Sequence, residues 1–210
     1  HPLKPHLPAW SPGAHVDLRL EDGKIRQYSL TSDPQDLSRY AITVKRENDG
    51  RGGSSWIHEY LIEGVVARVS TPRNNFVLSE TRSLLIAGGV GVTPLISIGR
   101  ALNEKNLLYA FHFCSRRRQS NVERDLKNFC DSTLSTYVSD EPKSPRLDLV
   151  ALIGSLPRDL HIYCCGPKRL MAEVKELTND WNPKQIHFEF FSTEIDENYK
   201  PEPFNVIISS

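Results

Sequence analysis

The sequence lacks the features that define several large classes of protein. No apolar run approaches the roughly 20 residues that a membrane-spanning helix needs, and nothing at the start resembles a signal peptide. Lys plus Arg and Asp plus Glu both number 26, so no net charge attracts nucleic acid or an anionic membrane. The 210 residues contain no internal repeat and no low-complexity tract. We expect a cytoplasmic globular protein of one large or two small domains that binds neither nucleic acid nor membrane.

Cysteine is also scarce. The four cysteines are too few for a disulfide scaffold, and their spacing matches no zinc or iron–sulfur pattern. They are Cys114, Cys130, Cys164 and Cys165. The seven histidines suggest no catalytic pair. We therefore expect reduced thiols and no metal held by this chain.

What the chain does contain changes character near residue 81. Before that point, short segments that alternate between apolar and polar residues are separated by turns. The predicted strands cover residues 15–20, 26–30, 40–46 and 65–70. Strands at this spacing are typical of a small antiparallel barrel or sandwich.

From residue 82 onward, buried apolar segments alternate with segments of helical period. The predicted strands cover 83–87, 107–113 and 161–165, and the predicted helices cover 95–102, 122–129 and 168–177. This alternation indicates a parallel sheet with helices on its faces. We therefore expect a β-barrel over residues 1–81 and a nucleotide-binding α/β domain over residues 82–195.

A glycine cluster at 87–94, directly after the first apolar strand of the second half, is the strongest local signal. Gly88, Gly89 and Gly91 would let the backbone approach a pyrophosphate, and the following helix would offer free N–H groups to it. Pro94 suits the first turn of that helix, because its missing N–H would be unpaired there. The alternative is a tight turn without a ligand.

Two further candidates lie in the first half. The strand segment 26–29 presents an arginine, a tyrosine and a serine, which either contact a ligand or line a barrel. The loop 50–55 combines three glycines, two hydroxyls and an arginine ahead of a short helix predicted at 56–61. This composition suits a phosphate cradle, and a plain hairpin turn is the alternative.

The last candidate is the turn Cys165-Gly166-Pro167, between a strand and a helix. Ligands of open α/β sheets bind beyond the carboxyl ends of the strands, where this turn lies. Cys165 is then a reactive thiol, a packing residue or a small neighbour of a ligand. Cys164 points to the other face of the strand, and we expect it in the core.

In this order and at these spacings, the segments together resemble one family. The series is Arg-x-Tyr-Ser-Leu at 26–30, Val-Lys-Arg-x-x-x-Gly-Arg-Gly-Gly-Ser at 44–54, Pro-Arg-Asn-x-Phe at 72–76, Gly-Gly-x-Gly-x-Thr-Pro at 88–94, Tyr-Cys-Cys-Gly-Pro at 163–167 and His-Phe-Glu at 187–189. From about Pro12 to Phe191 the chain resembles the phthalate dioxygenase reductases, a branch of the ferredoxin–NADP reductase superfamily that includes the vanillate demethylase reductases.

The resemblance implies a fold and a path for electrons. It implies a six-stranded antiparallel flavin-binding barrel, an NAD domain with a five-stranded parallel sheet, and a C-terminal plant-type ferredoxin domain. Hydride would pass from NADH or NADPH to FMN, and single electrons would then reach a 2Fe–2S centre that feeds a terminal oxygenase, either a Rieske-type enzyme or a haem monooxygenase. The scaffold of such an oxidoreductase mainly orients the two rings.

Flavin-binding residues follow from the matching positions. By resemblance, Tyr28 packs on the flavin ring, Arg26 supplies positive charge, and Ser29 completes that strand. Val44, Lys45 and Arg46 resemble the next flavin-contacting strand. The implied FMN phosphate loop, whose arginine favours FMN over FAD, consists of Gly50, Arg51, Gly52, Gly53, Ser54 and Ser55.

The nucleotide side is implied in the same way. Thr93 resembles a residue that touches both the flavin edge and the nicotinamide, and Phe191 resembles an aromatic residue at the flavin face. With Cys165, these two are the implied catalytic residues. The implied nucleotide-binding residues are Gly88, Gly89, Gly91, Pro94, Gly166, Pro167 and Met171.

The chain departs from its relatives after the second α/β strand, where the adenine ribose should lie. Ser115, Arg116, Arg117 and Arg118 stand where users of NADH often carry an acidic or neutral residue. A guanidinium group suits a 2′-phosphate, which would indicate NADPH. A solvated loop charge at Arg117 or Arg118 is the alternative, and both nucleotides remain open.

A second departure concerns the end of the chain. Residues 203–210 resemble the first strand of the ferredoxin domain, and no cysteine cluster follows them. We expect the sequence to be truncated there, with 196–210 as a linker and the start of a missing 2Fe–2S domain. The alternatives are a flavin subunit that serves a separate ferredoxin-type carrier protein, and a non-catalytic nucleotide-binding module.

Overall fold

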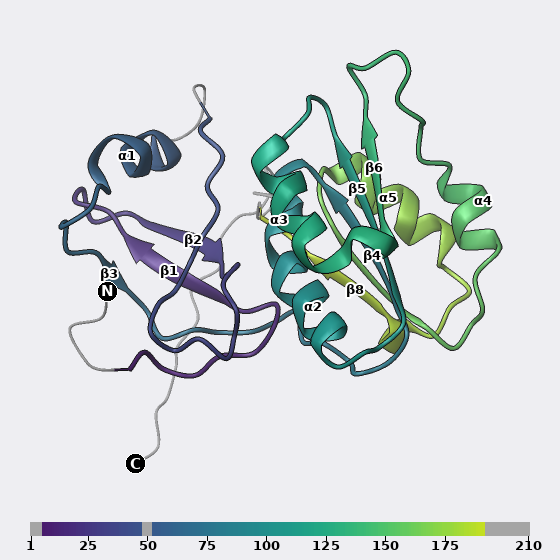
Figure 1. Ribbon diagram of the computed structural model, residues 1–210, viewed down its shortest axis with the longest axis horizontal. Coiled ribbons are helices and arrows are strands. Elements are labelled where there is room, and N and C mark those ends of the chain that lie inside the picture. Colours follow the sequence, from purple (N-terminus) through teal and green to yellow (C-terminus); the bar gives the residue numbers. More distant parts are fainter. Residues whose placement is uncertain (1–5, 48–51, 192–210) are drawn as a thin grey trace, which may run out of the picture.

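Residues 6–47 and 52–191 are described by the computed structural model of the chain. They form two halves that lie side by side along the longest axis of the molecule (Figure 1). Within the described ranges, no helix is both long and apolar enough to cross a membrane.

The first half is built on a small antiparallel sheet. Its strands are β1 (His15–Arg19), β2 (Ile25–Ser29) and β3 (Arg68–Val69), in the order β2-β1-β3. Gly23, at φ 79°, makes the turn between β1 and β2, a backbone conformation that favours glycine. Leu18 and Leu20 pack against Ile57 of α1 (Gly53–Tyr60), which closes the small core of this half.

The antiparallel sheet confirms the predicted class of the first half, but six barrel strands are not confirmed. Residues 40–46 contribute only an isolated bridge between Ile42 and Leu30, and β3 covers two of the residues predicted at 65–70. Val44 instead packs on the core beside α1. A β-branched residue such as Val44 suits a half-buried packing position as well as a strand. β propensity alone therefore does not distinguish the two.

The second half is a five-stranded parallel sheet. Its strands are β4 (Ser83–Gly88), β5 (Tyr109–Ser115), β6 (Leu134–Val138), β7 (His161–Cys165) and β8 (Ile186–Glu189), in the order β6-β5-β4-β7-β8. All four neighbouring pairs are parallel. The predicted parallel sheet is confirmed, and strand order reverses beside β4, where ligands of such sheets bind.

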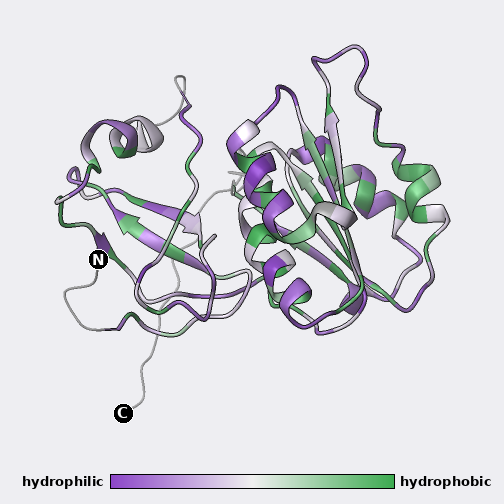
Figure 2. Cartoon of the chain, in the orientation of Figure 1, coloured by the Kyte–Doolittle hydropathy of each residue, from purple (hydrophilic) through white to green (hydrophobic). Residues whose placement is uncertain are grey.

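Helices cover both faces of this sheet (Figure 1). Leu85 and Ala87 of β4 point to the face under α2 (Val92–Glu104) and α3 (Ser120–Cys130). Leu84 and Ile86 point to the opposite face, under α4 (Leu149–Gly154) and α5 (Lys168–Leu177). Figure 2 shows hydrophobic and hydrophilic colours on the same helix, α3, which buries Leu126 and Cys130 and exposes Arg124, Asp125 and Lys127.

The helices predicted at 95–102, 122–129 and 168–177 are confirmed as α2, α3 and α5. The sequence did not predict β6, α4 or β8. The two strands lie at the edges of the sheet and α4 has only six residues, so none of them carries a long hydrophobic period. Three short 3₁₀ segments, η1 (Gly89–Gly91), η2 (Asp131–Thr133) and η3 (Pro183–Gln185), complete the elements of this half.

Contacts across the junction fix the two halves against each other. The backbone N–H of Gly13 donates to the buried Oγ of Ser97 on α2, over 3.0 Å. Phe76, in the segment between the halves, is 1% exposed and meets Tyr163 of β7 edge-on, with ring centroids 5.4 Å apart. The Tyr163 hydroxyl accepts from Ser79 N–H over 2.6 Å and donates to the carbonyl of Val77 over 3.3 Å. These contacts hold β1 and β2 opposite the carboxyl edge of the parallel sheet.

Candidate functional site

Two glycine turns meet at the carboxyl edge of the parallel sheet. One turn leaves β4 at Gly88 and the other leaves the neighbouring β7 through Gly166. A Cβ atom on Gly91 would lie 2.3 Å from the carbonyl oxygen of Cys165, and one on Gly88 would lie 2.5 Å from Pro167 Cδ. The two turns approach each other as closely as they do because these positions carry no side chain.

The start of α2 presents backbone N–H groups to this edge. Gly91 is the N-cap, and its position receives no side-chain hydrogen bond. Pro94 lies in the first turn of α2, as predicted. Thr93 is 3% exposed, and its hydroxyl donates to the carbonyl oxygen of Val90 over 3.1 Å. The Thr93 side chain therefore stabilises the turn from inside.

The adjacent cysteines point to opposite faces of β7. Cys165 is 1% exposed and lies in the core under α2 and α3, and Cys164 is fully buried in the core under α4 and α5, as predicted. Burial raises the pKa of the Cys165 thiol and raises the pKa of Cys164 to about 12. Both thiols are therefore protonated at neutral pH, which is inconsistent with the reactive-thiol alternative for Cys165.

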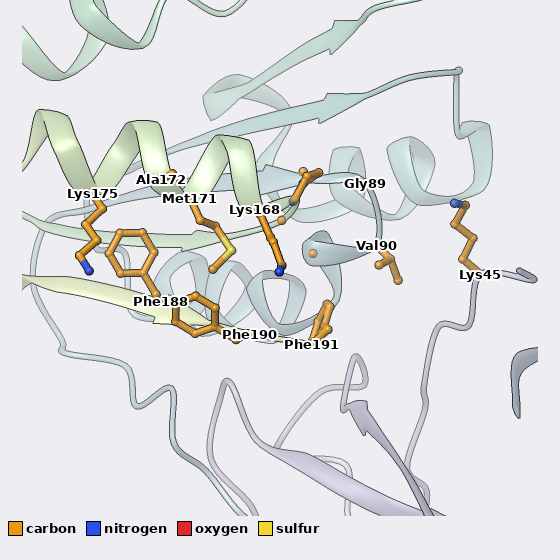
Figure 3. Close-up of a pocket in the computed structure, with 14 residues that line it drawn as sticks. Lys45, Gly89, Val90, Lys168, Met171, Ala172, Lys175, Phe188, Phe190 and Phe191 are labelled. Carbon is orange, nitrogen blue, oxygen red and sulfur yellow. The ribbon is translucent and has the colours of Figure 1, made fainter. Parts of the chain in front are cut away.

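An apolar cavity of about 910 Å³ opens beside the two turns (Figure 3). The turns form one wall, and α5 with the end of β8 forms the other. Figure 3 shows Met171 and Lys168 of α5 opposite the aromatic rings that follow β8. The wall from α5 and β8 consists of Lys168, Met171, Ala172, Lys175, Phe188, Phe190 and Phe191.

A second cavity, of about 1040 Å³, extends from the glycine turns to the end of β5. Arg116 and Arg117 both lie against one carboxylate, that of Asp140, at 3.4 and 3.6 Å. The Ser115 hydroxyl is buried and has no hydrogen-bond partner among the described residues. Basic residues dominate the lining: Lys45, Arg46, Arg116, Arg117, Arg146 and Arg169, against Glu47 and Glu173.

Arg118 does not line this cavity. Its guanidinium donates to both carboxylate oxygens of Glu141, over 2.6 and 2.8 Å, and to Glu123 over 3.0 Å. The hydrogen bond to Glu141 raises the pKa of Arg118, so the charge is fixed in this network. Of the two arginines considered from the sequence, Arg117 faces the cavity and Arg118 is paired.

A third cavity, of about 510 Å³, lies between the two halves. The strand residues Arg26, Tyr28 and Ser29 form one side, and Glu189, Phe190 and Phe191 form the other. Burial raises the pKa of Tyr28, so its hydroxyl is protonated at neutral pH. Phe190 and Phe191 also line the apolar cavity, and Lys45 and the glycine turns line both larger cavities. The three cavities therefore adjoin in one cleft.

The start of α1 closes the side of the site that the first half forms. Gly52, its N-cap, has φ 78°, and a Cβ on Gly53 would lie 2.8 Å from Arg26 Nε. The Arg26 side chain thus passes directly beside the first backbone N–H groups of α1. Ser54 Oγ accepts from the Glu47 N–H over 3.0 Å, which ties the helix start to the segment before it.

The residues singled out in the sequence fall into three groups. Those that line the cleft are Arg26, Tyr28, Ser29, Lys45, Arg46, Gly88, Gly89, Gly91, Ser115, Arg116, Arg117, Gly166, Pro167, Met171 and Phe191. Those that support it from inside or beside it are Val44, Gly52, Gly53, Ser54, Ser55, Thr93, Pro94 and Cys165. Gly50 and Arg51 lie outside the described residues.

Several lining residues were not found from the sequence. Lys168 and Arg169 directly follow Pro167, so the motif at 165–167 could have been extended to include them. Tyr137 and Ser139 lie at the end of β6, which the sequence did not predict. His15 and Glu189 line the cavity between the halves, and they come together only in the folded chain.

Comparison with known proteins gives relatives but no matching family model. Over 213 residues the chain is 35% identical to the phthalate 4,5-dioxygenase oxygenase reductase subunit of Pseudomonas putida. The match covers 99% of this chain and 66% of that protein, which is less than two thirds of its length.

Two solved structures are similar as well. Phthalate dioxygenase reductase, described as a modular structure for electron transfer from pyridine nucleotides to 2Fe-2S, has a TM-score of 0.79 and 31% identity, covering 88% of this chain and 59% of that one. An intact type IV self-sufficient cytochrome P450 monooxygenase has a TM-score of 0.84 and 35% identity, covering 91% of this chain and 25% of that one.

Proposed function

We propose a function from one premise: the chain belongs to the phthalate dioxygenase reductase family, within the ferredoxin–NADP reductase superfamily. The chain spans less than two thirds of such relatives, so its activity is inferred for the part that it contains. That part takes hydride from NAD(P)H onto bound FMN. Single electrons then leave for a 2Fe–2S centre, on a ferredoxin-type domain or protein, that feeds a terminal oxygenase.

One observation carries this proposal: the cavity between the halves adjoins the apolar cavity at the glycine turns, with Phe191 in the lining of both. A flavin ring held against Tyr28 would therefore face a nicotinamide held beside the turns. Two rings stacked across this junction are in the arrangement that hydride transfer needs. The chemistry is supplied by FMN when it is bound, which accepts a hydride and releases electrons singly.

The residues around Arg26 fit a flavin phosphate. The Arg26 guanidinium group passes beside the start of α1, so a fixed positive charge and free helical N–H groups lie together. We assign the phosphate to Arg26 and the loop 50–55, and the ring to Tyr28, Ser29 and the segment 44–46. We propose a flavin domain over 1–81 and a nucleotide domain over 82–195.

The residues around the glycine turns suit the nicotinamide half of the nucleotide. We assign the pyrophosphate to Gly88, Gly89, Gly91 and the start of α2, and the nicotinamide to Gly166, Pro167, Met171 and Phe191. Thr93 and Cys165 would act as supports, because the Thr93 hydroxyl is bonded to the backbone and the Cys165 side chain is buried. Thr93 stabilises the turn after β4 from within, and the backbone of Cys165 lies against Gly91 of that turn.

The basic cavity at the end of β5 favours NADPH. In α/β nucleotide domains an acidic residue in this region binds the ribose 2′-hydroxyl, whereas an arginine accommodates a 2′-phosphate. Ser115 offers a buried hydroxyl that lacks a partner among the described residues, and Arg116 and Arg117 share one carboxylate between two positive charges. A 2′-phosphate dianion would accept a hydrogen bond from the Ser115 hydroxyl and would balance the second positive charge of Arg116 and Arg117.

FMN binding tests the flavin assignment. Protein loaded with FMN and passed through gel filtration should retain the visible absorbance of the flavin. Arg26→Ala should weaken FMN binding by about tenfold or more, because it removes a charge-assisted hydrogen bond. Arg19→Ala, an exposed arginine on the neighbouring β1, is the matched control and should leave the dissociation constant unchanged. A wild-type protein that retains no flavin would contradict the proposal.

The protein that accepts the electrons is part of the same proposal. The electrons would finally reach a Rieske-type oxygenase or a haem monooxygenase. They would travel through an attached ferredoxin domain or, as the second arrangement that the sequence allows, through a separate carrier protein.

We also propose a cytoplasmic location, because the four cysteines are free thiols.

A further inference from the structure

Two titratable side chains from different halves meet in the cavity between β1, β2 and the end of β8. His15 is the first residue of β1 and Glu189 is the last residue of β8. His15 Nδ1 lies 4.0 Å from a Glu189 carboxylate oxygen, and both residues line the cavity with Tyr28 and Phe191. This separation is too long for a hydrogen bond and short enough for strong coupling between charges.

The His15 ring is buried and incompletely bonded. The residue is 5% exposed, and its Nδ1 atom has no hydrogen-bond partner among the described residues. Nε2 lies 3.4 Å from Nε2 of Gln27, whose amide donates to it when the ring is neutral. The remaining proton of the neutral ring is then on Nδ1, facing Glu189. Rotation of the Gln27 amide by half a turn would present its oxygen to a protonated Nε2.

The surroundings disfavour the charged form of each side chain. Burial lowers the pKa of His15, the charge of Arg73 lowers it further, and Asp17 opposes this. Burial raises the pKa of Glu189. Arg26 and Asp17 also line the cavity, and Arg73 is paired with Asp17 at 2.6 Å, so two positive groups and one negative group lie at or beside the cavity. The Cys165 thiol near Glu189 is protonated, since its pKa is raised.

We propose that His15 and Glu189 form a proton-binding pair that takes up one proton when negative charge is added to this cavity. The inference rests on the proposed function, because hydride transfer to a flavin in the cavity adds one negative charge. The proton comes from solvent and binds at Nε2 of His15, and the Nδ1–H group then donates to the Glu189 carboxylate. When the two electrons leave, the proton delivered with the hydride and the proton on His15 are both released.

Proton uptake by the pair has a measurable consequence. Without it, hydride transfer couples one proton to two electrons. With it, two protons accompany two electrons over the pH range in which His15 is neutral beside oxidised flavin and protonated beside reduced flavin. The two-electron midpoint potential of the bound flavin then falls twice as steeply with pH in that range as above it.

The test is potentiometry on the FMN-loaded chain between pH 5 and 9. We expect a change of slope in the wild type, its loss in His15→Gln, and its displacement to lower pH in Glu189→Gln, which removes the carboxylate that stabilises the protonated ring. His161→Gln is the control: His161 is also partly buried and hydrogen-bonded, but it lies at the opposite end of β7 from Cys165, and its removal should leave the wild-type slopes.

A second measurement does not depend on a variant that folds. ¹⁵N NMR of the histidine rings in the wild-type holoprotein should show His15 binding its proton about tenfold more tightly, or more, when the flavin is reduced. An unchanged His15 titration, or a slope change that His15→Gln retains, would overturn the pair. Failure to bind FMN at all would overturn the proposed function and the pair together, whereas bound FMN with these outcomes overturns the pair alone.

Discussion

The backbone carbonyl oxygen of Cys165 fills the space in which a side chain on Gly91 would begin. The Cβ of an alanine at this position would lie 2.3 Å from that oxygen and 2.6 Å from the backbone nitrogen of Gly166. Backbone atoms cannot rotate out of the way, so the approach of the two turns depends on glycine at position 91. The spacing of the two turns at the cleft follows from this contact.

Gly91→Ala should therefore destabilise the protein by about 1–3 kcal/mol, the typical range for overpacking. Urea unfolding followed by circular dichroism would measure it. Gly154→Ala is the matched control, because no atom lies within 4 Å of its added Cβ and the residue ends α4 without a positive φ. An equal loss of stability in Gly91→Ala and Gly154→Ala would show that the contact with the Cys165 backbone is not the cause.

Phe76→Ala should cost about 3–5 kcal/mol of stability, because a 1% exposed ring between the halves would leave a cavity beside Tyr163. Phe190, which is 68% exposed, provides the comparison. Its replacement by alanine should change the free energy of unfolding by less than about 1 kcal/mol. Differential scanning calorimetry of both variants distinguishes the two positions, and a Phe76→Ala protein as stable as the wild type would argue against a rigid junction.

Thiol reactivity should be low at neutral pH. Burial raises the pKa of Cys114 to about 11 and that of Cys164 to about 12, so the reactive thiolate forms are scarce at pH 7. Alkylation by iodoacetamide, followed by mass spectrometry, should be slow in the native protein and should accelerate at Cys114 as the pH approaches 11. Rapid labelling of Cys165 at pH 7 would restore the reactive-thiol interpretation.

Nucleotide choice should depend on Arg117. Arg117→Asp should lower the ratio of kcat/KM for NADPH to that for NADH by about 10- to 100-fold, because a repelling carboxylate replaces a charge-assisted contact to the 2′-phosphate. Steady-state reduction of an artificial electron acceptor measures both nucleotides. Arg124→Asp, on α3 and away from the cleft, carries the same charge change as a control. An unchanged ratio in Arg117→Asp would remove the 2′-phosphate assignment.

The parts of the fold that the sequence predicted are those in which local pattern and tertiary packing agree. The helices α2, α3 and α5 have a buried stripe of helical period, and β4 and β7 are short buried runs, so periodicity located them. The edge strands β6 and β8 bury less, and the segment 40–46 packs without a ladder. Their structure is decided by neighbours that a local pattern does not contain.

In the site, too, some features follow from local sequence and others depend on distant parts of the chain. The glycine turns could be predicted because close backbone approach requires glycine, whatever the surroundings. The pairing of Arg118 with Glu141 and the meeting of His15 with Glu189 could not, because these partners are 23 and 174 positions apart in the chain. Burial likewise argues against the reactive-thiol alternative for Cys165, and no sequence pattern states how deeply one residue is buried.

Transfer of hydride within the cleft is the central claim, and one measurement tests it most directly. FMN-loaded protein is mixed with NADPH in the absence of oxygen, and the visible absorbance of the flavin is followed. We predict that the flavin bleaches in a single turnover, and faster with NADPH than with equal NADH. A flavin that both nucleotides leave oxidised, while dithionite reduces it, would contradict the account.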